Sequence, residues 1–199
     1  MGFEIVQRFE QEIAQFYGAP YAVATDCCTH AIELSLRVEP LAAMVCPTHT
    51  YISVPMTLQK LKLPWSWIDE PWEDYYFLGN TRIIDAAVYW KKDSYISDSL
   101  MCLSFQFQKH LSLGRGGAIL CDDKFTYDVL KRMTYDGRDP HIPWKEQDIE
   151  HIGYHYYMTP ETAQLGLDSL PDAEIRKPKK WTSADYPDLR NMTVFQNLR

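Results

Sequence analysis

The chain has 199 residues and a mass of 23.3 kDa, enough for one ordinary domain with a hydrophobic core or for two very small ones. Hydrophobic residues make up 46% and charged residues 24%, which excludes a largely disordered protein, a collagen-like fibre and a coiled coil. The net charge of −7 lacks the basic excess of a typical nucleic-acid-binding module, so we expect no nucleic-acid partner.

The cysteines and the N-terminal segment indicate a cellular compartment. There are five cysteines, an odd number, and no CxxC pair occurs among them: Cys27, Cys28, Cys46, Cys102 and Cys121. This usage predicts reduced thiols and a cytoplasmic protein. The first residues carry acidic side chains throughout, unlike a signal peptide, and no apolar run is long enough to span a bilayer. We therefore expect no membrane association.

The first predicted elements are a helix, a strand and a second helix. In residues 3–17 apolar side chains recur every three or four positions, which indicates an amphipathic helix, and Gly18 is a typical stop. Residues 21–25 (YAVAT) read as a short apolar strand. A tight turn follows and leads into the second helix, for which Asp26 or Thr29 is the candidate cap.

Further short strands and helices alternate along the chain. Strands are predicted at 43–47, 65–69, 82–87, 101–105 and 117–121, and helices at 53–61, at 124–135 and from about 159 to 170. Such alternation implies an α/β sheet with parallel pairs, in which ligands lie at the carboxyl ends of the strands. Residues 70–80 are turn-rich. Residues 171–199 are rich in Pro, Lys and Asp, which predicts a loosely structured tail packed on the body or on a partner chain.

Two strand ends carry polar groups that suit a charged ligand. The turn between Asp26 and Thr29 leads straight into a helix, where free backbone N–H groups, the helix dipole and the Thr29 hydroxyl can hold a phosphate. The same turn is also compatible with plain helix capping. Asp85 closes an apolar strand, where its carboxylate can either orient a ligand cation or start the next turn.

Lys109 lies between a strand and a glycine-rich turn and is flanked by apolar residues. A partly desolvated lysine has a lowered pKa and becomes a nucleophile toward aldehydes. Spacing alone favours an exposed lysine beside a hairpin. Tyr51 follows another strand, where it can stack on a planar ligand or belong to the core. His151 and His155 are four apart without an HExxH context, so no metal site is predicted.

Seven short sequence motifs, which occur in order over residues 3–170, resemble the sugar aminotransferases of the DegT/DnrJ/EryC1/StrS family, which are fold type I enzymes of pyridoxal 5'-phosphate (PLP). The motifs are Phe9-Glu10 with YGA at 17–19 and YAVAT at 21–25, THAIEL at 29–34, PTHTY at 47–51, IDAA at 84–87, Ser104-Phe105 with Lys109, the glycines Gly114, Gly116 and Gly117, and the run from IGY at 152–154 through Met158-Thr159 to LGL at 165–167. Any one motif alone is weak evidence for the family, but seven in the same order are hard to obtain by chance.

The resemblance implies an α/β fold, namely the large domain of an aspartate aminotransferase-like PLP enzyme, with a mainly parallel sheet flanked by helices. Residues 1–170 would be a shortened PLP-binding large domain, and residues 171–199 a remnant of the small domain, which is largely absent. The implied activity is PLP-dependent transfer of an amino group from an amino acid, glutamate, to a keto sugar that is nucleotide-linked. The family's sites lie at a dimer interface, so a homodimer with shared active sites is implied.

The resemblance also implies two catalytic residues. Lys109 looks like the lysine that bonds PLP covalently and then moves a proton. Asp85 looks like the partner of the pyridinium nitrogen, which it keeps protonated so that the ring acts as an electron sink.

Five further residues resemble cofactor-binding positions. Cys28 and Thr29 match a Gly-Thr pair that binds the cofactor phosphate, and Ser104 would be a further phosphate ligand. Tyr51 would stack on the pyridine ring. His110 occupies the place of an asparagine that reaches the phosphate in the neighbouring subunit's site.

The sequence departs from the family pattern at several positions. Val88 stands where the family has a hydrogen-bonding Gln or His, and Cys28 replaces the glycine of the phosphate turn. Arg115 stands where a glutamate is usual, and His155 and Tyr157 replace an Asn and an Arg. The connection between the strands that end near residues 69 and 85 is short, so a strand and a helix of the large domain are expected to be missing.

Three other hypotheses follow from these departures. A non-catalytic protein that binds PLP or a sugar and keeps the aminotransferase fold is the main alternative, because the small domain is largely absent. A dehydratase-like enzyme of the same family typically has His in place of the lysine, and Lys109 argues against it. A purely structural α/β module would bind no cofactor.

Overall fold

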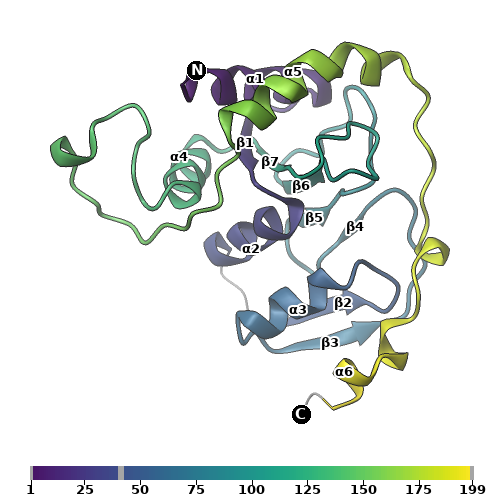
Figure 1. Cartoon of the computed structure of the whole chain (residues 1–199). Coiled ribbons are helices and arrows are strands. Elements are labelled where there is room, and N and C mark those ends of the chain that lie inside the picture. The colour runs from purple at the N-terminus through teal and green to yellow at the C-terminus, as the bar shows by residue number, and fades with distance from the viewer. Residues whose placement is uncertain (1, 40–42, 198–199) are drawn as a thin grey trace.

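The computed structural model describes residues 2–39 and 43–197, and Figure 1 shows helices on both sides of a central sheet. The first helix, α1 (Glu4–Tyr17), ends where the sequence predicts. Gly18 adopts the left-handed backbone (φ 73°) that closes a helix at little steric cost. The apolar stripe of α1 is buried in the core, as its periodicity predicts.

The central sheet has five strands. In spatial order they are β1 (Tyr21–Thr25), β7 (Gly117–Cys121), β6 (Leu100–Ser104), β5 (Ile83–Asp85) and β4 (Tyr76–Phe77). Two further strands, β2 (Met44–Pro47) and β3 (Trp65–Ile68), pair in parallel as a separate sheet. Every strand that the sequence predicts is therefore present, and β4 is an additional strand in the turn-rich segment.

The central sheet is mixed, and the expectation of a mainly parallel sheet is wrong in this respect. β5 and β6 pair in parallel, but β1–β7, β6–β7 and β4–β5 are antiparallel. For the pairs β4–β5 and β5–β6, the connection lengths give the physical reason. Residues 78–82 form a short turn that returns β5 beside β4, whereas the longer run 86–99 provides the crossover that a parallel pair needs.

Both faces of the central sheet are covered, which explains why its strands read as continuous apolar runs. Along β6, Met101 and Leu103 pack in one cluster with α1 and α5 (Pro160–Ile175). The alternate side chains, Leu100 and Cys102, pack in a second cluster on the other face. The helices of that second face are α2 (Cys28–Val38), α3 (Ser53–Lys60) and α4 (Lys124–Thr134).

Two segments differ from the expected lengths. Within residues 70–82, all of which the structure describes, β4 is the only regular element, which agrees with a missing strand and helix in this connection. α5 does not end before Pro171 but continues through it to Ile175. Its side chains Leu170 and Ala173 are buried against the α1 side of the core, and this packing holds the helix beyond the proline.

The tail after α5 packs on the body, as expected, but it has regular structure of its own. It contains η2 (Ser183–Asp185), η3 (Leu189–Asn191) and α6 (Thr193–Gln196). In Figure 1 it runs from the end of α5 past β4 to α6, which lies beside β3. Its backbone accepts a hydrogen bond from Asp74 N at the Trp181 carbonyl and donates one from Leu189 N to the Thr48 carbonyl, both at 2.9 Å.

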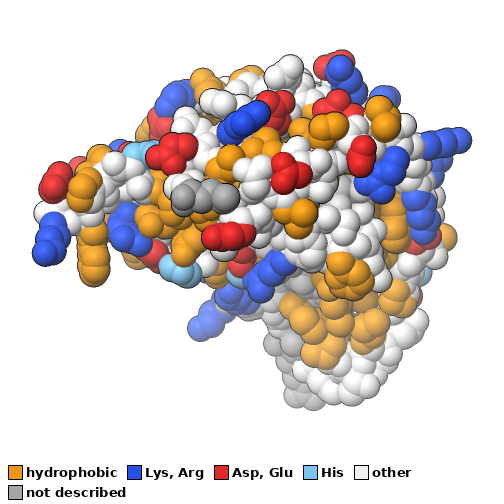
Figure 2. Space-filling view, turned by 45° about the horizontal axis from the view of Figure 1, so that its top comes forward, with side chains coloured by type: hydrophobic (Ala, Val, Ile, Leu, Met, Phe, Trp, Pro, Cys, Tyr) orange, Lys and Arg blue, Asp and Glu red, His pale blue; other side chains and the backbone are white. Residues whose placement is uncertain are grey.

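The surface carries an arm of residues 136–155, which projects beside α4 and contains the turn η1 (Trp144–Glu146). Figure 2 shows hydrophobic side chains on this projection, and acidic and basic side chains interspersed over the face in view. Among the described residues, no helix is both long and apolar enough to cross a membrane.

Candidate active site

A cavity of about 290 Å³ lies where β5 and β6 end and α2 begins. Its volume is close to the lower limit of the ~300–1,000 Å³ range of ligand pockets. Six of the seven predicted site residues line it: Cys28, Thr29, Tyr51, Asp85, Ser104 and Lys109. The structure thus brings together residues that are up to 81 positions apart in the sequence, between Cys28 and Lys109.

The amino end of α2 forms one wall of this cavity. The helix begins at Cys28, and Cys27 is its N-cap without a side-chain capping bond to the described residues. The expected caps are therefore wrong. Asp26 instead accepts a hydrogen bond from Arg115, and the Thr29 hydroxyl lies 2.8 Å from the Ser53 hydroxyl. Uncapped N–H groups beside two hydroxyls form a typical anion-binding arrangement.

Gly117 allows the sheet to approach this wall closely. A Cβ atom at Gly117 would lie 2.5 Å from the carbonyl carbon of Cys27 and from the backbone nitrogen of Cys28. No other residue type fits such a distance to a backbone without displacing it. The glycine-rich turn of the sequence therefore has a steric role, which is to place β7 directly against the start of α2.

Asp85 is a buried carboxylate at the end of β5. The Tyr76 hydroxyl donates to its Oδ2 at 2.6 Å, and the Ala87 backbone N–H donates to its Oδ1 at 3.0 Å. Burial raises the pKa of Asp85, whereas these hydrogen bonds and the charge of Lys109 oppose the rise. Each oxygen accepts one bond here and retains acceptor capacity for a ligand.

Lys109 lies in the loop between β6 and β7 and is half-buried. Desolvation lowers the pKa of its amine, although Cys28 and Asp85 oppose this shift. The amine lies 5.5 Å from the centre of the Trp181 ring. The structure thus favours a desolvated lysine over the exposed one, and such an amine has a larger unprotonated, nucleophilic fraction.

The tail contributes three residues to the cavity that the sequence reasoning missed: Trp181, Asp185 and Tyr186. The Tyr186 carbonyl accepts a hydrogen bond from His49 Nδ1 at 2.8 Å, which ties the tail to the segment next to Tyr51. Tyr51 itself is 56% exposed at the cavity. No local pattern in the tail signals these contacts, because they join segments more than 70 residues apart.

His110 is the predicted residue that the structure places elsewhere. Its Nε2 donates to the Ala173 carbonyl at 2.8 Å, and its ring is tilted against Trp90 at 5.3 Å. It lines a neighbouring cavity of about 140 Å³ together with Val88 and Lys109. Lys109 therefore borders both cavities, but His110 and the divergent Val88 border only the smaller one.

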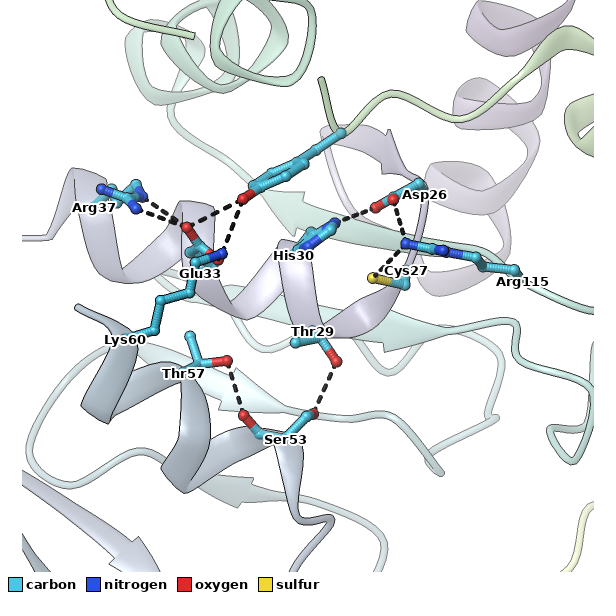
Figure 3. A network of polar contacts seen from close by, with 11 residues as sticks. Asp26, Cys27, Thr29, His30, Glu33, Arg37, Ser53, Thr57, Lys60 and Arg115 are labelled. Atoms are coloured by element: carbon cyan, nitrogen blue, oxygen red, sulfur yellow. Dashed lines mark hydrogen bonds and ion pairs between the residues drawn. The ribbon is translucent and has the colours of Figure 1, made fainter. Parts of the chain in front are cut away.

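A charged network lies behind the start of α2 (Figure 3). Asp26, Cys27 and His30 place three potential metal-ligand atoms within 4.8 Å of one another. However, Arg115 lies 2.7 Å from Asp26 Oδ2 and 4.0 Å from Cys27 Sγ, so a cation already balances this group. Burial alone would lower the pKa of His30, but hydrogen bonds to Asp26 and Cys27 raise it to about 9.

A second part of the network joins α2 to α3 (Figure 3). The buried Glu33 accepts hydrogen bonds from Arg37 at 2.7 Å and from Lys60 at 2.8 Å. Burial would raise the pKa of Glu33, but its two cationic partners lower it. This ion-pair group fixes the helix whose first turn lines the cavity.

Comparison with known proteins places the chain in a family. A model of the DegT/DnrJ/EryC1/StrS aminotransferase family matches residues 2–74 and 89–188, which leaves Asp85 in the unmatched gap. The 3-amino-5-hydroxybenzoate synthase of Amycolatopsis mediterranei is 39% identical over 64 residues, 31% of this chain and 16% of that protein.

Solved structures share the fold. AtS13 from Actinomadura melliaura has a TM-score of 0.75 at 18% identity, covering 87% of this chain and 61% of that chain. Spr1654 from Streptococcus pneumoniae, assigned as a sugar aminotransferase and solved in its PLP form, has a TM-score of 0.69 at 17% identity over 85% and 59% of the two chains. The chain thus spans about three fifths of the length of these structures. Since the family match extends over most of its residues, the chain belongs to the DegT/DnrJ/EryC1/StrS aminotransferase family.

Proposed function

We propose that this chain is a PLP-dependent aminotransferase that moves an amino group from an amino acid to a keto sugar. We further propose glutamate as the donor and a nucleotide-linked sugar as the acceptor. One observation carries the proposal: the desolvated amine of Lys109 and the buried carboxylate of Asp85 border a single cavity at the start of α2.

The chemistry of the cavity wall fits PLP. The uncapped first turn of α2 and the Thr29 hydroxyl suit a phosphate, and the Asp85 carboxylate suits a protonated ring nitrogen. The Lys109 amine suits an aldehyde. The family is PLP-dependent, and Spr1654 of Streptococcus pneumoniae has been solved in both PLP and PMP forms.

Each predicted residue then has a role. Bound PLP supplies an electron sink for the bonds broken at the donor carbon. The Lys109 amine would hold the cofactor at its carbonyl carbon and, when free, would move the proton at the donor carbon. Asp85 would keep the ring nitrogen protonated. Cys28, Thr29 and Ser104 would bind the phosphate.

Tyr51 and the tail would complete the site. Tyr51 would cover the ring as an aromatic face, and Trp181 and Tyr186 of the tail line the same cavity. We propose that residues 1–170 act as a shortened PLP-binding large domain and that residues 171–199 contribute side chains to its cavity. The boundary falls within α5, so the two parts are continuous through one helix.

A homodimer with shared sites belongs to this proposal. The projecting arm supports it, because Trp144 is 71% and Ile152 is 82% exposed, which is unfavourable for an isolated chain. His110 would contribute to a partner's site only after giving up its bond to the Ala173 carbonyl.

A specific observation favours the second candidate, a protein that binds PLP or a sugar without turnover. Val88 offers no hydrogen bond where the family has one, and it borders the smaller cavity beside Lys109. A ring hydroxyl that lacks this partner would be less well oriented for catalysis.

A visible absorbance spectrum of the protein with PLP separates the two functions. An aminotransferase gives a visible band that bleaches when glutamate is added. The Lys109→Ala variant gives no band, whereas the control Lys179→Ala retains it. Lys179 is a matched control because its exposed amine lies 3.6 Å from the centre of the Trp181 ring, which the Lys109 amine also faces. A band that no amino donor bleaches supports the binding protein, and no band in the wild type contradicts both.

A further inference from the structure

Tyr76 is a buried residue of β4 that lies next to the candidate site without lining its cavity. It belongs to the segment 75–88, which the family model does not match. β4 pairs with β5 in antiparallel fashion, and Tyr76 is the residue that faces Asp85 in this register. The short connection that replaces the missing elements therefore places a phenol directly beside the site carboxylate.

The hydrogen bonds around Tyr76 form a directed chain. An ionised Asp85 can only accept, so the Tyr76 hydroxyl donates to Asp85 Oδ2 at 2.6 Å. The same hydroxyl then accepts from the Thr50 Oγ1, its second hydrogen-bond partner. Thr50 immediately precedes Tyr51, and both Thr50 and Tyr76 are buried. The Trp72 ring, at 5.1 Å, fixes the phenol from outside.

We propose that Tyr76, supported by Thr50, is a positioning residue that keeps Asp85 ionised and aims its free acceptor sites at the cavity. This inference rests on the proposed function, because it gives Asp85 a ring nitrogen to serve. A buried carboxylate without donors tends to take up a proton and become neutral. Tyr76 and the Ala87 N–H supply one donor to each oxygen and oppose that tendency.

The proton shared between Asp85 and a ring nitrogen makes this contact functional. A carboxylate stabilised by the phenol is a weaker base, so the proton stays on the ring nitrogen, where the electron sink requires it. Without the phenol, the carboxylate is the stronger base and draws the proton toward itself. Tyr76 thus acts through Asp85 and does not itself contact the ligand.

The first test uses the protein without cofactor. The carboxyl carbons of aspartate are isotope-labelled, and the NMR signal of Asp85 is identified as the one that is lost in Asp85→Asn. The protonation of Asp85 is then followed by NMR as the pH is varied. Loss of a hydrogen bond to a charged group in Tyr76→Phe shifts the protonation equilibrium about tenfold or more toward the neutral acid. Tyr95→Phe is the matched control, since the Tyr95 hydroxyl donates to the Ser99 carbonyl and lines neither cavity.

Thr50 provides a second, independent pair of variants if Tyr76→Phe folds poorly. Thr50→Val removes the hydroxyl at nearly constant side-chain volume. It should shift the protonation equilibrium of Asp85 in the same direction as Tyr76→Phe, by a smaller amount. Thr50→Ser retains the hydroxyl and should restore the wild-type titration. An Asp85 titration that is the same in Tyr76→Phe, Thr50→Val and the wild type overturns the inference.

A cofactor labelled at its ring nitrogen separates this inference from the proposed function. If PLP binds, its nitrogen signal should move toward the unprotonated position in Tyr76→Phe but not in Tyr95→Phe. If PLP does not bind to the wild type, the proposed function fails, while the titration of Asp85 still decides whether Tyr76 controls its ionisation. An unchanged nitrogen signal in Tyr76→Phe contradicts the inference.

Discussion

Burial favours the uncharged form of both Lys109 and Asp85. It lowers the pKa of the amine and raises the pKa of the carboxyl. The hydrogen bonds from Tyr76 and the Ala87 N–H oppose the rise at Asp85, whereas among the described residues none donates to or accepts from the Lys109 amine. One cavity thereby combines a desolvated amine with a carboxyl group that accepts two hydrogen bonds, which is the combination that the proposed cofactor needs.

His30 should make the stability of the protein depend on pH. Its pKa is about 9 in the folded chain against an ordinary value of 6.5, so its contribution is present below pH 6.5 and is lost as the pH rises through 9. Denaturant unfolding should show His30→Gln to be less stable than the wild type by about 1–2 kcal/mol at pH 6, after allowance for partial solvent exposure. The difference should vanish near pH 10.

Asp26→Asn is the companion variant for this measurement, because it removes the carboxylate 2.6 Å from His30 Nδ1. Asp26→Asn should reduce the pH-dependent contribution of His30 to the free energy of unfolding. If His30→Gln and the wild type keep a constant difference between pH 6 and pH 10, the assignment of the charged state to His30 is wrong.

At the scale of elements, the close contact of β7 with the start of α2 predicts the effect of one methyl group. In Gly117→Ala the new Cβ would lie 2.5 Å from the backbone of Cys27 and Cys28, so the first turn of α2 must move. We expect a loss of about 1–3 kcal/mol in the free energy of unfolding. We also expect weaker binding of PLP, because the displaced turn is the proposed phosphate site.

Urea unfolding and a PLP titration followed by absorbance measure these two effects. Ala118→Gly, at the next position of β7, is a control that weakens the strand without adding an atom near α2. If Gly117→Ala binds PLP like the wild type, the first turn of α2 does not hold the phosphate.

Local patterns predicted the elements well, since helix and strand periodicity depends on neighbouring residues. They did not predict strand direction, because pairing is set by connections such as 78–82 and by partners far away in the sequence. They also placed the end of α5 before Pro171, where packing of Leu170 and Ala173 against the α1 side outweighs the cost of a proline.

At the scale of the whole molecule, side chains of the body and of the C-terminal tail line the same cavity. The resemblance predicted six of the body residues that line the cavity, because they stand in or beside the motifs that match the family. It did not predict Trp181 or Tyr186, which stand in the tail. Nor did it predict Tyr76, whose segment has no counterpart in the family match.

The tail wall gives a prediction at this scale. Trp181→Ala should weaken PLP binding about tenfold or more, because it removes an aromatic side chain that lines the cavity and whose ring centre lies 5.5 Å from the Lys109 amine. Phe125→Ala, at an exposed aromatic residue of α4 that lines neither cavity, is the matched control and should bind PLP normally. Equal affinities of the two variants, measured by absorbance titration, would show that the tail does not form part of the site.

Lys109 is the residue that we propose to hold the cofactor. Reduction with borohydride after incubation with PLP fixes the cofactor carbon to the amine that holds it, and peptide mass spectrometry then identifies that amine. We expect stoichiometric labelling of Lys109, which should be abolished in Lys109→Ala and reduced in Asp85→Asn. Labelling spread over exposed lysines such as Lys179, with Lys109 unmodified, would show that Lys109 does not hold the cofactor.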